Sequence, residues 1–141
     1  MRKRLVSAAV VLSFGYASNH GWAQSAEAAL PSLYEAAQAT RGQAVYASSC
    51  ASCHGKELVG GGAPALTGPQ FFTKQMNTKL GGVFQYMARE MPQGRPGSLT
   101  HDQYADLISF ILQKNGFPAG DSPLSYDAAL RSDVIIYFAK Q

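Results

Sequence analysis

The five residues Cys50-Ala51-Ser52-Cys53-His54 constrain this 141-residue chain more than any other stretch. Two cysteines three positions apart, with a histidine directly after the second, form the attachment site of a c-type haem. If the motif continues a preceding helix, both cysteines lie on one face and can form thioethers with one haem edge. His54 then falls beneath the macrocycle, where its imidazole can bind the iron. The motif therefore predicts one covalently attached haem c.

Three other uses of a cysteine pair compete with this interpretation. A structural zinc site needs four ligands, and the chain contains no second cysteine pair. A thioredoxin-like dithiol usually sits at a strand-to-helix turn of a βαβ unit, and no such pattern surrounds the motif. A disulfide between Cys50 and Cys53 stays open at this point.

The N-terminal residues have the pattern of a secretory signal. Arg2-Lys3-Arg4 precedes a short apolar run from Leu5 to Phe14, and Gly21-Trp22-Ala23 offers small residues for cleavage. The apolar run is shorter than the roughly 18 to 20 residues that a membrane-spanning helix requires. We therefore expect residues 1–23 to be a signal peptide, with export to the periplasm and no transmembrane span after cleavage.

The formal net charge of +3 belongs to this leader. Without Arg2, Lys3 and Arg4 the count of Lys+Arg falls from 12 to 9, which equals the 9 Asp+Glu. Nucleic-acid binding therefore has no support. Six basic residues occupy the stretch from Arg41 to Arg95, whereas five aspartates follow His101. This asymmetry predicts a basic surface that orients a redox partner, with an ordinary solvated surface as the alternative.

Two capping boxes predict the principal helices. Thr40-Arg41-Gly42-Gln43 predicts a helix with Thr40 as N-cap, and its glycine permits a close helix crossing. Thr100-His101-Asp102-Gln103 predicts a second helix, which ends at Asn115-Gly116. Between them, periodicity predicts a helix over residues 80–89 with Val83 and Met87 facing inward.

The loop after the motif, Gly62-Ala63-Pro64-Ala65-Leu66-Thr67-Gly68, adds a family resemblance. Together with residues 50–54 it resembles the class I c-type cytochromes. The resemblance implies an all-α fold in which the N- and C-terminal helices cross around one covalently bound haem. It also implies that the Pro64 carbonyl accepts a hydrogen bond from the proximal imidazole of His54, and that Leu66 packs on the haem. A plain turn proline is the alternative for Pro64.

A second loop, Met91-Pro92-Gln93-Gly94-Arg95-Pro96-Gly97, resembles the distal segment of the same family. The resemblance implies that Met91 binds the iron opposite His54. Met87 is the main alternative, followed by Met76 and His101. The predicted haem-binding residues are Cys50, Cys53, His54, Pro64, Leu66 and Met91, with His54 and Met91 on the iron.

The stretch Asn115-Gly116-Phe117-Pro118-Ala119-Gly120 is most similar to cytochromes associated with bacterial quinoprotein dehydrogenases. This resemblance implies an electron-transfer protein rather than an enzyme, which carries single electrons from a dehydrogenase to an acceptor such as a terminal oxidase. The alternatives are a tightly bound cytochrome subunit of a dehydrogenase or oxidase complex, and a haem enzyme or sensor with a displaceable distal ligand. The expected domains are a signal peptide (1–23), a flexible lead-in (24–39), the cytochrome c domain (40–118) and a C-terminal tail packing on that domain (119–141).

Overall fold

The computed structural model describes residues 30–72 and 79–136, so the predicted signal peptide, Lys74 and Met76 lie outside the described residues. Within these two ranges the regular structure is helical, apart from two isolated β-bridges. The helices are α1 (Ala36–Ser49), α2 (Ala51–His54), α3 (Pro69–Phe72), α4 (Leu80–Glu90), α5 (His101–Lys114) and α6 (Tyr126–Leu130). No helix in the described part of the chain is both long and apolar enough to cross a membrane. The predicted all-α architecture is confirmed.

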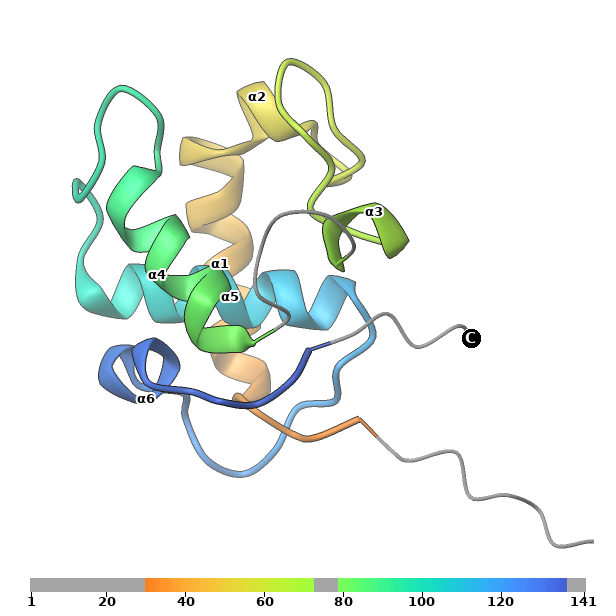
Figure 1. The fold of residues 1–141 in the computed structure, drawn as a ribbon, viewed down its shortest axis with the longest axis vertical. Helices are drawn as coiled ribbons and strands as arrows, with labels where there is room; N and C mark the ends of the chain where they lie inside the picture. The colour runs from red at the N-terminus through yellow and green to blue at the C-terminus, as the bar shows by residue number, and fades with distance from the viewer. Residues whose placement is uncertain (1–29, 73–78, 137–141) are drawn as a thin grey trace, which may run out of the picture.

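Helices α1 and α5 cross each other (Figure 1), and Gly42 sits at the point of contact. A Cβ atom on Gly42 would stand 1.9 Å from the carbonyl oxygen of Asp106 and 2.9 Å from Cβ of Phe110. The ring of Tyr46, one turn further along α1, packs on Phe110 with the ring centroids 5.5 Å apart. The predicted close crossing of the N- and C-terminal helices is therefore confirmed.

The start of α1 differs from the prediction. The helix begins at Ala36, and the side-chain oxygen of Gln38 accepts a hydrogen bond of 3.3 Å from the backbone N–H of Glu35. Thr40 lies inside the helix, where its hydroxyl donates to the carbonyl of Ala36 at 3.2 Å. The prediction that Thr40 is the N-cap was wrong, because Glu35 is the N-cap and the side chain of Gln38, three residues later, returns to the Glu35 backbone N–H.

The other two predicted helices agree with the structure. Helix α4 buries Val83 and Met87, as its periodicity indicates. Both hydrogen bonds of the predicted capping box at Thr100 are present at the start of α5, at 3.2 and 2.8 Å. Helix α5 ends at Lys114 with Asn115 as its C-cap, as predicted, and Gly116 follows with a φ of 84°, the left-handed conformation that glycine tolerates.

Residues 120–136 run back over the helices (Figure 1). The Gln38 side chain both donates to and accepts from the backbone of Leu124, at 2.9 and 2.8 Å. The backbone N–H groups of Leu80 and Gly81, which have no partner within their own helix, donate to the carbonyls of Val134 and Ser132, each at 2.9 Å. The tail thereby supplies hydrogen-bond acceptors for the first N–H groups of α4, the helix that leads to Met91.

Candidate haem site

The CxxCH motif forms a helical turn directly after α1. Cys50 closes α1 by donating its N–H to the Tyr46 carbonyl at 2.9 Å, and its backbone φ of −128° breaks the helix there. The Cys50 carbonyl then accepts from the N–H groups of Cys53 and His54, at 3.1 and 3.0 Å. The motif therefore occupies a single turn, rather than an unbroken continuation of α1.

Both cysteines are free thiols in this structure, so Cys50 and Cys53 do not form a disulfide there. Cys53 is exposed and Cys50 is half-buried. Burial raises the pKa of Cys50 to about 11, with a further contribution from neighbouring Cys53. Before haem attachment, Cys50 is thus a protonated, uncharged thiol at neutral pH. Within residues 30–72 and 79–136 no group of three His, Cys, Asp or Glu side chains is placed to hold a metal ion, so zinc gains no support there.

The His54 imidazole contacts Pro64, the residue that the family resemblance implies as its partner. Its Nδ1 lies 2.8 Å from the carbonyl oxygen of Pro64. A carbonyl can only accept, so Nδ1 carries the hydrogen and donates it. The other ring nitrogen, Nε2, then has a free lone pair, which is the state of an imidazole that binds a metal.

Backbone hydrogen bonds hold Pro64 in place. The loop folds back on the motif, with Ala63 N–H donating to the Cys53 carbonyl at 2.9 Å and Gly60 N–H donating to the His54 carbonyl at 3.0 Å. Gly60 has a φ of 95° and Gly55 a φ of 80°, backbone conformations that glycine adopts without strain. The glycines around this loop therefore allow the tight return that brings Pro64 to the imidazole.

Leu58 also shapes this loop, although no sequence pattern indicates its role. Its side chain is fully buried, although its φ of 59° is unusual for a leucine. Its carbonyl accepts from the Leu66 N–H at 2.8 Å and from the Thr67 hydroxyl at 3.2 Å. Leu58 thus fixes the backbone of Leu66, which was predicted to pack on the haem.

Asn115 is the second residue whose role in the site is not evident from the sequence. Its amide nitrogen donates to the carbonyl of Leu66 at 2.9 Å and to that of Ile111 at 2.8 Å. Its side-chain oxygen accepts from the Gly68 N–H at 3.0 Å. The residue that ends α5 therefore also anchors the loop carrying Leu66.

The candidate distal ligands occupy distinct places. Met91 directly follows α4 as its extended C-cap, and its half-buried side chain packs against the core. Met87 lies one turn earlier in the helix and is 8% exposed. The His101 ring stacks on Tyr126 with the centroids 3.8 Å apart and the planes at 7°. Figure 1 shows the loop after α4 and the loop after α2 at the same end of the molecule.

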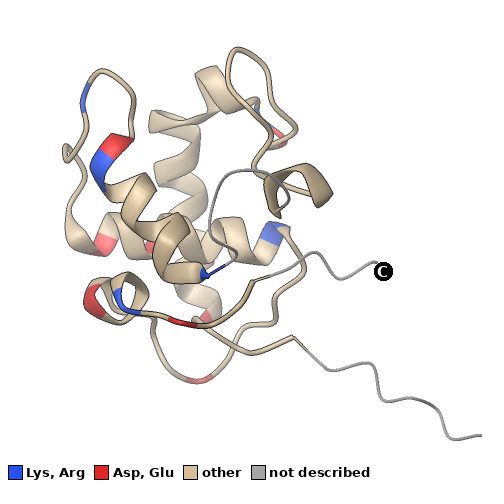
Figure 2. Cartoon of the chain, in the orientation of Figure 1, with Lys and Arg blue, Asp and Glu red and all other residues tan. Residues whose placement is uncertain are grey.

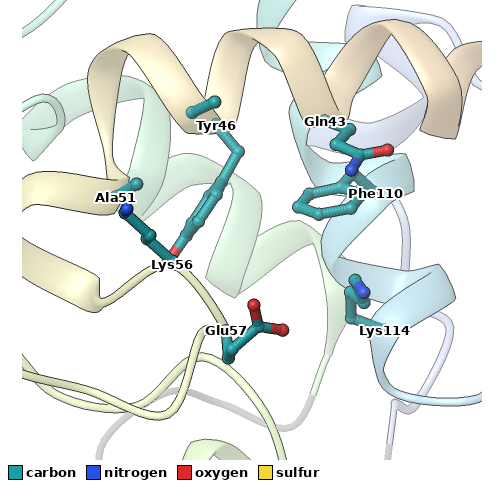
Figure 3. A pocket seen from close by; sticks show the side chains of 8 residues that line it. Gln43, Tyr46, Ala51, Lys56, Glu57, Phe110 and Lys114 are labelled. Carbon is teal, nitrogen blue, oxygen red and sulfur yellow. The ribbon is translucent and has the colours of Figure 1, made fainter.

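A cavity of about 280 Å³ lies elsewhere (Figure 3). Tyr46 and Phe110 form part of its wall where α1 crosses α5. The remaining lining residues are Gln43, Ala47, Ala51, Lys56, Glu57 and Lys114. None of the predicted haem-binding residues lines this cavity, so it is distinct from the candidate haem site.

Comparison with known families shows which family the chain belongs to. The family model described as "Cytochrome C oxidase, cbb3-type, subunit III" matches residues 37–111. The chain belongs to this family of class I c-type cytochromes. It is therefore a cytochrome c electron-transfer domain, and its cofactor is haem c with its iron. Comparison with curated protein sequences gives no match.

Solved structures resemble this cytochrome to different extents. A chain of the sulfane dehydrogenase SoxCD from Paracoccus pantotrophus is 28% identical, with a TM-score of 0.57. The match covers 70% of this cytochrome and 52% of that chain, so the cytochrome spans about half the length of the SoxCD chain. Cytochrome cL from Hyphomicrobium denitrificans is 23% identical, with a TM-score of 0.45, 62% of this chain covered and 64% of that one. Thiosulfate dehydrogenase (TsdBA) from Marichromatium purpuratum is 27% identical, with a TM-score of 0.42 and coverages of 73% and 24%.

The residues around the motif fit a covalently held haem. The two thiols are free for thioether bonds, and His54 has the tautomer that leaves Nε2 for iron. Apolar side chains of α3 and of the loops after α2 and α4 pack on the core while keeping part of their surface uncovered. They include Leu66, Phe71, Phe72, Met91 and Leu99. A flat apolar group would cover that surface and gain the free energy of burial.

Proposed function

We propose that this chain is a periplasmic monohaem cytochrome that carries single electrons from a dehydrogenase to an acceptor such as a terminal oxidase. In this proposal the haem is attached at Cys50 and Cys53, and the iron is bound by His54 and Met91. The 2.8 Å contact between His54 and Pro64, next to the free cysteine pair, carries the proposal. It gives the imidazole the tautomer and orientation that a proximal ligand needs.

The chain's own residues then favour electron transfer over substrate chemistry. Bound haem c supplies an iron that alternates between the ferric and ferrous states. The hydrogen bond to Pro64 makes His54 a more basic ligand, and the soft thioether of Met91 favours the ferrous state. With His54 and Met91 both bound, the iron would have no position open to a substrate, and Leu66 would help to exclude water from it. The cytochrome should therefore exchange electrons at its surface, through a contact burying roughly 1,200 Å² or less.

Two observations support the proposed export to the periplasm and the proposal that a dehydrogenase donates the electrons. The residues 1–23 have the basic, apolar and small-residue pattern of an export signal. The SoxCD chain, which is similar in sequence and fold, comes from a dehydrogenase. A dehydrogenase is accordingly the proposed electron donor, and a quinoprotein dehydrogenase is the specific class that residues 115–120 suggest.

Export and attachment are tested by the mass of the exported protein. We expect the mass of the chain cleaved after Ala23 plus one haem, with the haem remaining on the protein in acidic organic solvent. Extraction of the haem by that solvent would contradict attachment at Cys50 and Cys53. A mass that includes residues 1–23 would contradict cleavage.

The distal ligand is tested by two methionine variants. The oxidised wild-type protein should show the absorption band of a low-spin methionine–iron bond. Met91→Ala should abolish the band, lower the reduction potential and allow carbon monoxide to bind the reduced protein. Met87→Leu, a substitution of similar volume inside α4, should leave the spectrum unchanged. If Met87→Leu abolishes the band and Met91→Ala does not, Met91 is not the ligand.

A tightly bound subunit of a dehydrogenase complex is the second candidate, and the similarity to a SoxCD chain favours it. Purification without detergent or high salt distinguishes the two. A free carrier elutes at the size of the monomer, whereas a subunit elutes with a dehydrogenase that mass spectrometry identifies. Binding of carbon monoxide by the reduced wild-type protein would instead favour a haem enzyme or sensor.

A further inference from the structure

One hydroxyl group bridges the two ends of the loop that carries Met91. Tyr104, in the first turn of α5, donates its hydroxyl hydrogen to the Met91 carbonyl at 2.7 Å. The same oxygen accepts a hydrogen bond of 3.1 Å from the backbone N–H of Gly97. Residues 91–97 open the connection between α4, which ends at Glu90, and α5, which begins at His101, and this hydroxyl joins the first and last residues of that segment.

The loop has little other attachment to the protein. Pro92 is buried, but residues 93–98 are all exposed. Two backbone hydrogen bonds, from Arg95 N–H to the Pro92 carbonyl at 2.9 Å and from Ser98 N–H to the Arg95 carbonyl at 3.2 Å, join this segment to itself. They shape its turns without fixing them to a helix. The Tyr104 hydroxyl thus supplies hydrogen bonds that join this loop to α5.

Tyr104 is itself held firmly. Its side chain is 2% exposed, and the capping box of Thr100 fixes the first turn of α5. Tyr126 from α6 packs beside it with the ring centroids 6.3 Å apart. Tyr126 in turn packs edge-on against Phe84 of α4, at 5.1 Å. Aromatic contacts from the tail thus fix the ring whose hydroxyl holds the loop.

We propose that Tyr104 is a positioning residue for the distal iron ligand. By holding the Met91 carbonyl and the Gly97 N–H together, it restricts the backbone from which the Met91 thioether extends. Iron–thioether bonding is then favoured because less conformational freedom is lost when the bond forms. This inference rests on the proposed role of Met91 as ligand.

The test compares two tyrosine-to-phenylalanine variants of the holoprotein. Tyr104→Phe removes the bridge but keeps the ring. Tyr34→Phe is the matched control, because Tyr34 is 1% exposed and its hydroxyl also donates to a backbone carbonyl, that of Phe117, at 2.7 Å. The first readout is hydrogen exchange of the Gly97 amide. The second is the concentration of imidazole that displaces the methionine–iron band of the oxidised protein.

In Tyr104→Phe, the Gly97 amide should exchange roughly two- to tenfold faster, as expected for one lost hydrogen bond. The imidazole concentration at half-displacement should fall by a similar factor. Tyr34→Phe should leave both readouts at their wild-type values. Equal behaviour of the two variants would overturn the inference.

The inference and the proposed function fail in different ways. If the wild-type protein lacks a methionine–iron band, or Met91→Ala leaves the band in place, the proposed ligand is wrong and this inference falls with it. If Met91→Ala abolishes the band but Tyr104→Phe has no effect beyond that of Tyr34→Phe, only the inference is overturned.

Discussion

The carbonyl oxygen of Asp106 occupies the space that a side chain on Gly42 would need. A Cβ atom at Gly42 would lie 1.9 Å from that oxygen, well inside van der Waals contact. The adjacent Arg41 donates two hydrogen bonds of 2.7 Å to the Asp106 carboxylate. One residue of α5 thus contacts α1 through both its backbone and its side chain. This contact fixes how the helix leading into the CxxCH motif sits on the C-terminal helix.

Gly42→Ala should therefore separate α1 from α5 and destabilise the protein. Overpacking of this kind costs roughly 1–3 kcal/mol, and the gain of about 1 kcal/mol in helix propensity offsets only part of it. Denaturant unfolding of the holoprotein, followed by helical circular dichroism, measures the change. Gly62→Ala is the control, because no heavy atom lies within 4 Å of a Cβ built there. Equal stabilities of the two variants would contradict the tight crossing.

The parts of the site that the sequence predicts depend on contacts between near neighbours in the chain. The motif is five residues long, and Pro64 lies only ten residues beyond His54. The capping box at Thr100 likewise involves residues three apart, and it is present as predicted. The capping box predicted at Thr40 is absent because the helix begins earlier, with Glu35 as N-cap and Gln38 bonded to its N–H. Glutamate is not among the preferred N-cap residues, so the sequence does not indicate this start.

The residues that the sequence did not reveal act over long distances along the chain. Asn115 was recognised as a helix end, but its hydrogen bonds to Leu66 and Gly68 join residues nearly 50 positions apart. The apolar periodicity of α5 indicates that Tyr104 is buried, but not that its hydroxyl binds the loop at Met91. A hydrophobic pattern shows which face of a helix is buried, but it does not show where a hydroxyl or amide on that face finds its partner.

Asn115→Ala should loosen the loop that carries Leu66. The change leaves the Leu66 carbonyl and the Gly68 N–H without their side-chain partner. These two groups are part-buried, and each lost hydrogen bond costs about 0.5–1.5 kcal/mol, so the unfolding free energy should fall by roughly 1–3 kcal/mol. Gln113→Ala, an exposed substitution in the last turn of α5, is the control. Hydrogen exchange of the Gly68 amide should rise in Asn115→Ala alone.

We expect the protein to lose stability at alkaline pH because Tyr46 is buried. Burial raises its pKa to about 12, with smaller contributions from Cys50 and Glu57. Burial, the largest cause, persists when Cys50 forms a thioether. Because the folded-state pKa lies above the usual 10, the neutral phenol contributes stability that is fully present below about pH 10 and is lost as the pH rises to about 12. The loss is on the order of 2 kcal/mol.

Denaturant unfolding at a series of alkaline pH values measures this effect. Tyr46→Phe should flatten the fall in stability between about pH 10 and 12, while lowering stability at neutral pH because the hydrogen bond from Tyr46 to the Gly55 carbonyl is lost. Tyr86→Phe, at a tyrosine that is 47% exposed, is the control and should keep the wild-type pH dependence. An unchanged slope in Tyr46→Phe would show that other groups cause the alkaline loss.

The charge asymmetry of the sequence is partly cancelled by the fold. Asp106 pairs with Arg41, and Asp133 pairs with Lys79 at 2.7 Å, so acidic residues of the C-terminal part lie beside basic residues of the middle part. The hydrogen bond from Lys79 lowers the pKa of Asp133. Figure 2 shows both signs of charge spread over the described ribbon. Fewer unpaired basic residues are therefore left to form the predicted basic surface than the sequence indicates.

Lys56 and Arg95 are the basic residues in the described ranges that best fit a steering role. Both are exposed, neither takes part in the two ion pairs, and they follow His54 and Met91 closely in the chain. We expect the anion hexacyanoferrate(III) to oxidise the reduced cytochrome roughly two- to fivefold more slowly in Lys56→Glu or Arg95→Glu at low salt. The reduction potential should change little, because both charges are solvated.

The control is Arg131→Glu, which makes the same charge reversal at an exposed residue of the tail. It should leave the rate near the wild-type value, and added salt should remove the differences among all three variants because exposed charges are screened over about 8 Å at physiological ionic strength. A cationic cobalt(III) oxidant should show the opposite order, with the glutamate variants at Lys56 and Arg95 reacting faster. If Arg131→Glu slows hexacyanoferrate(III) equally, net charge alone governs the rate. Docking would then depend on apolar surface near the motif, where Val59 is 70% exposed.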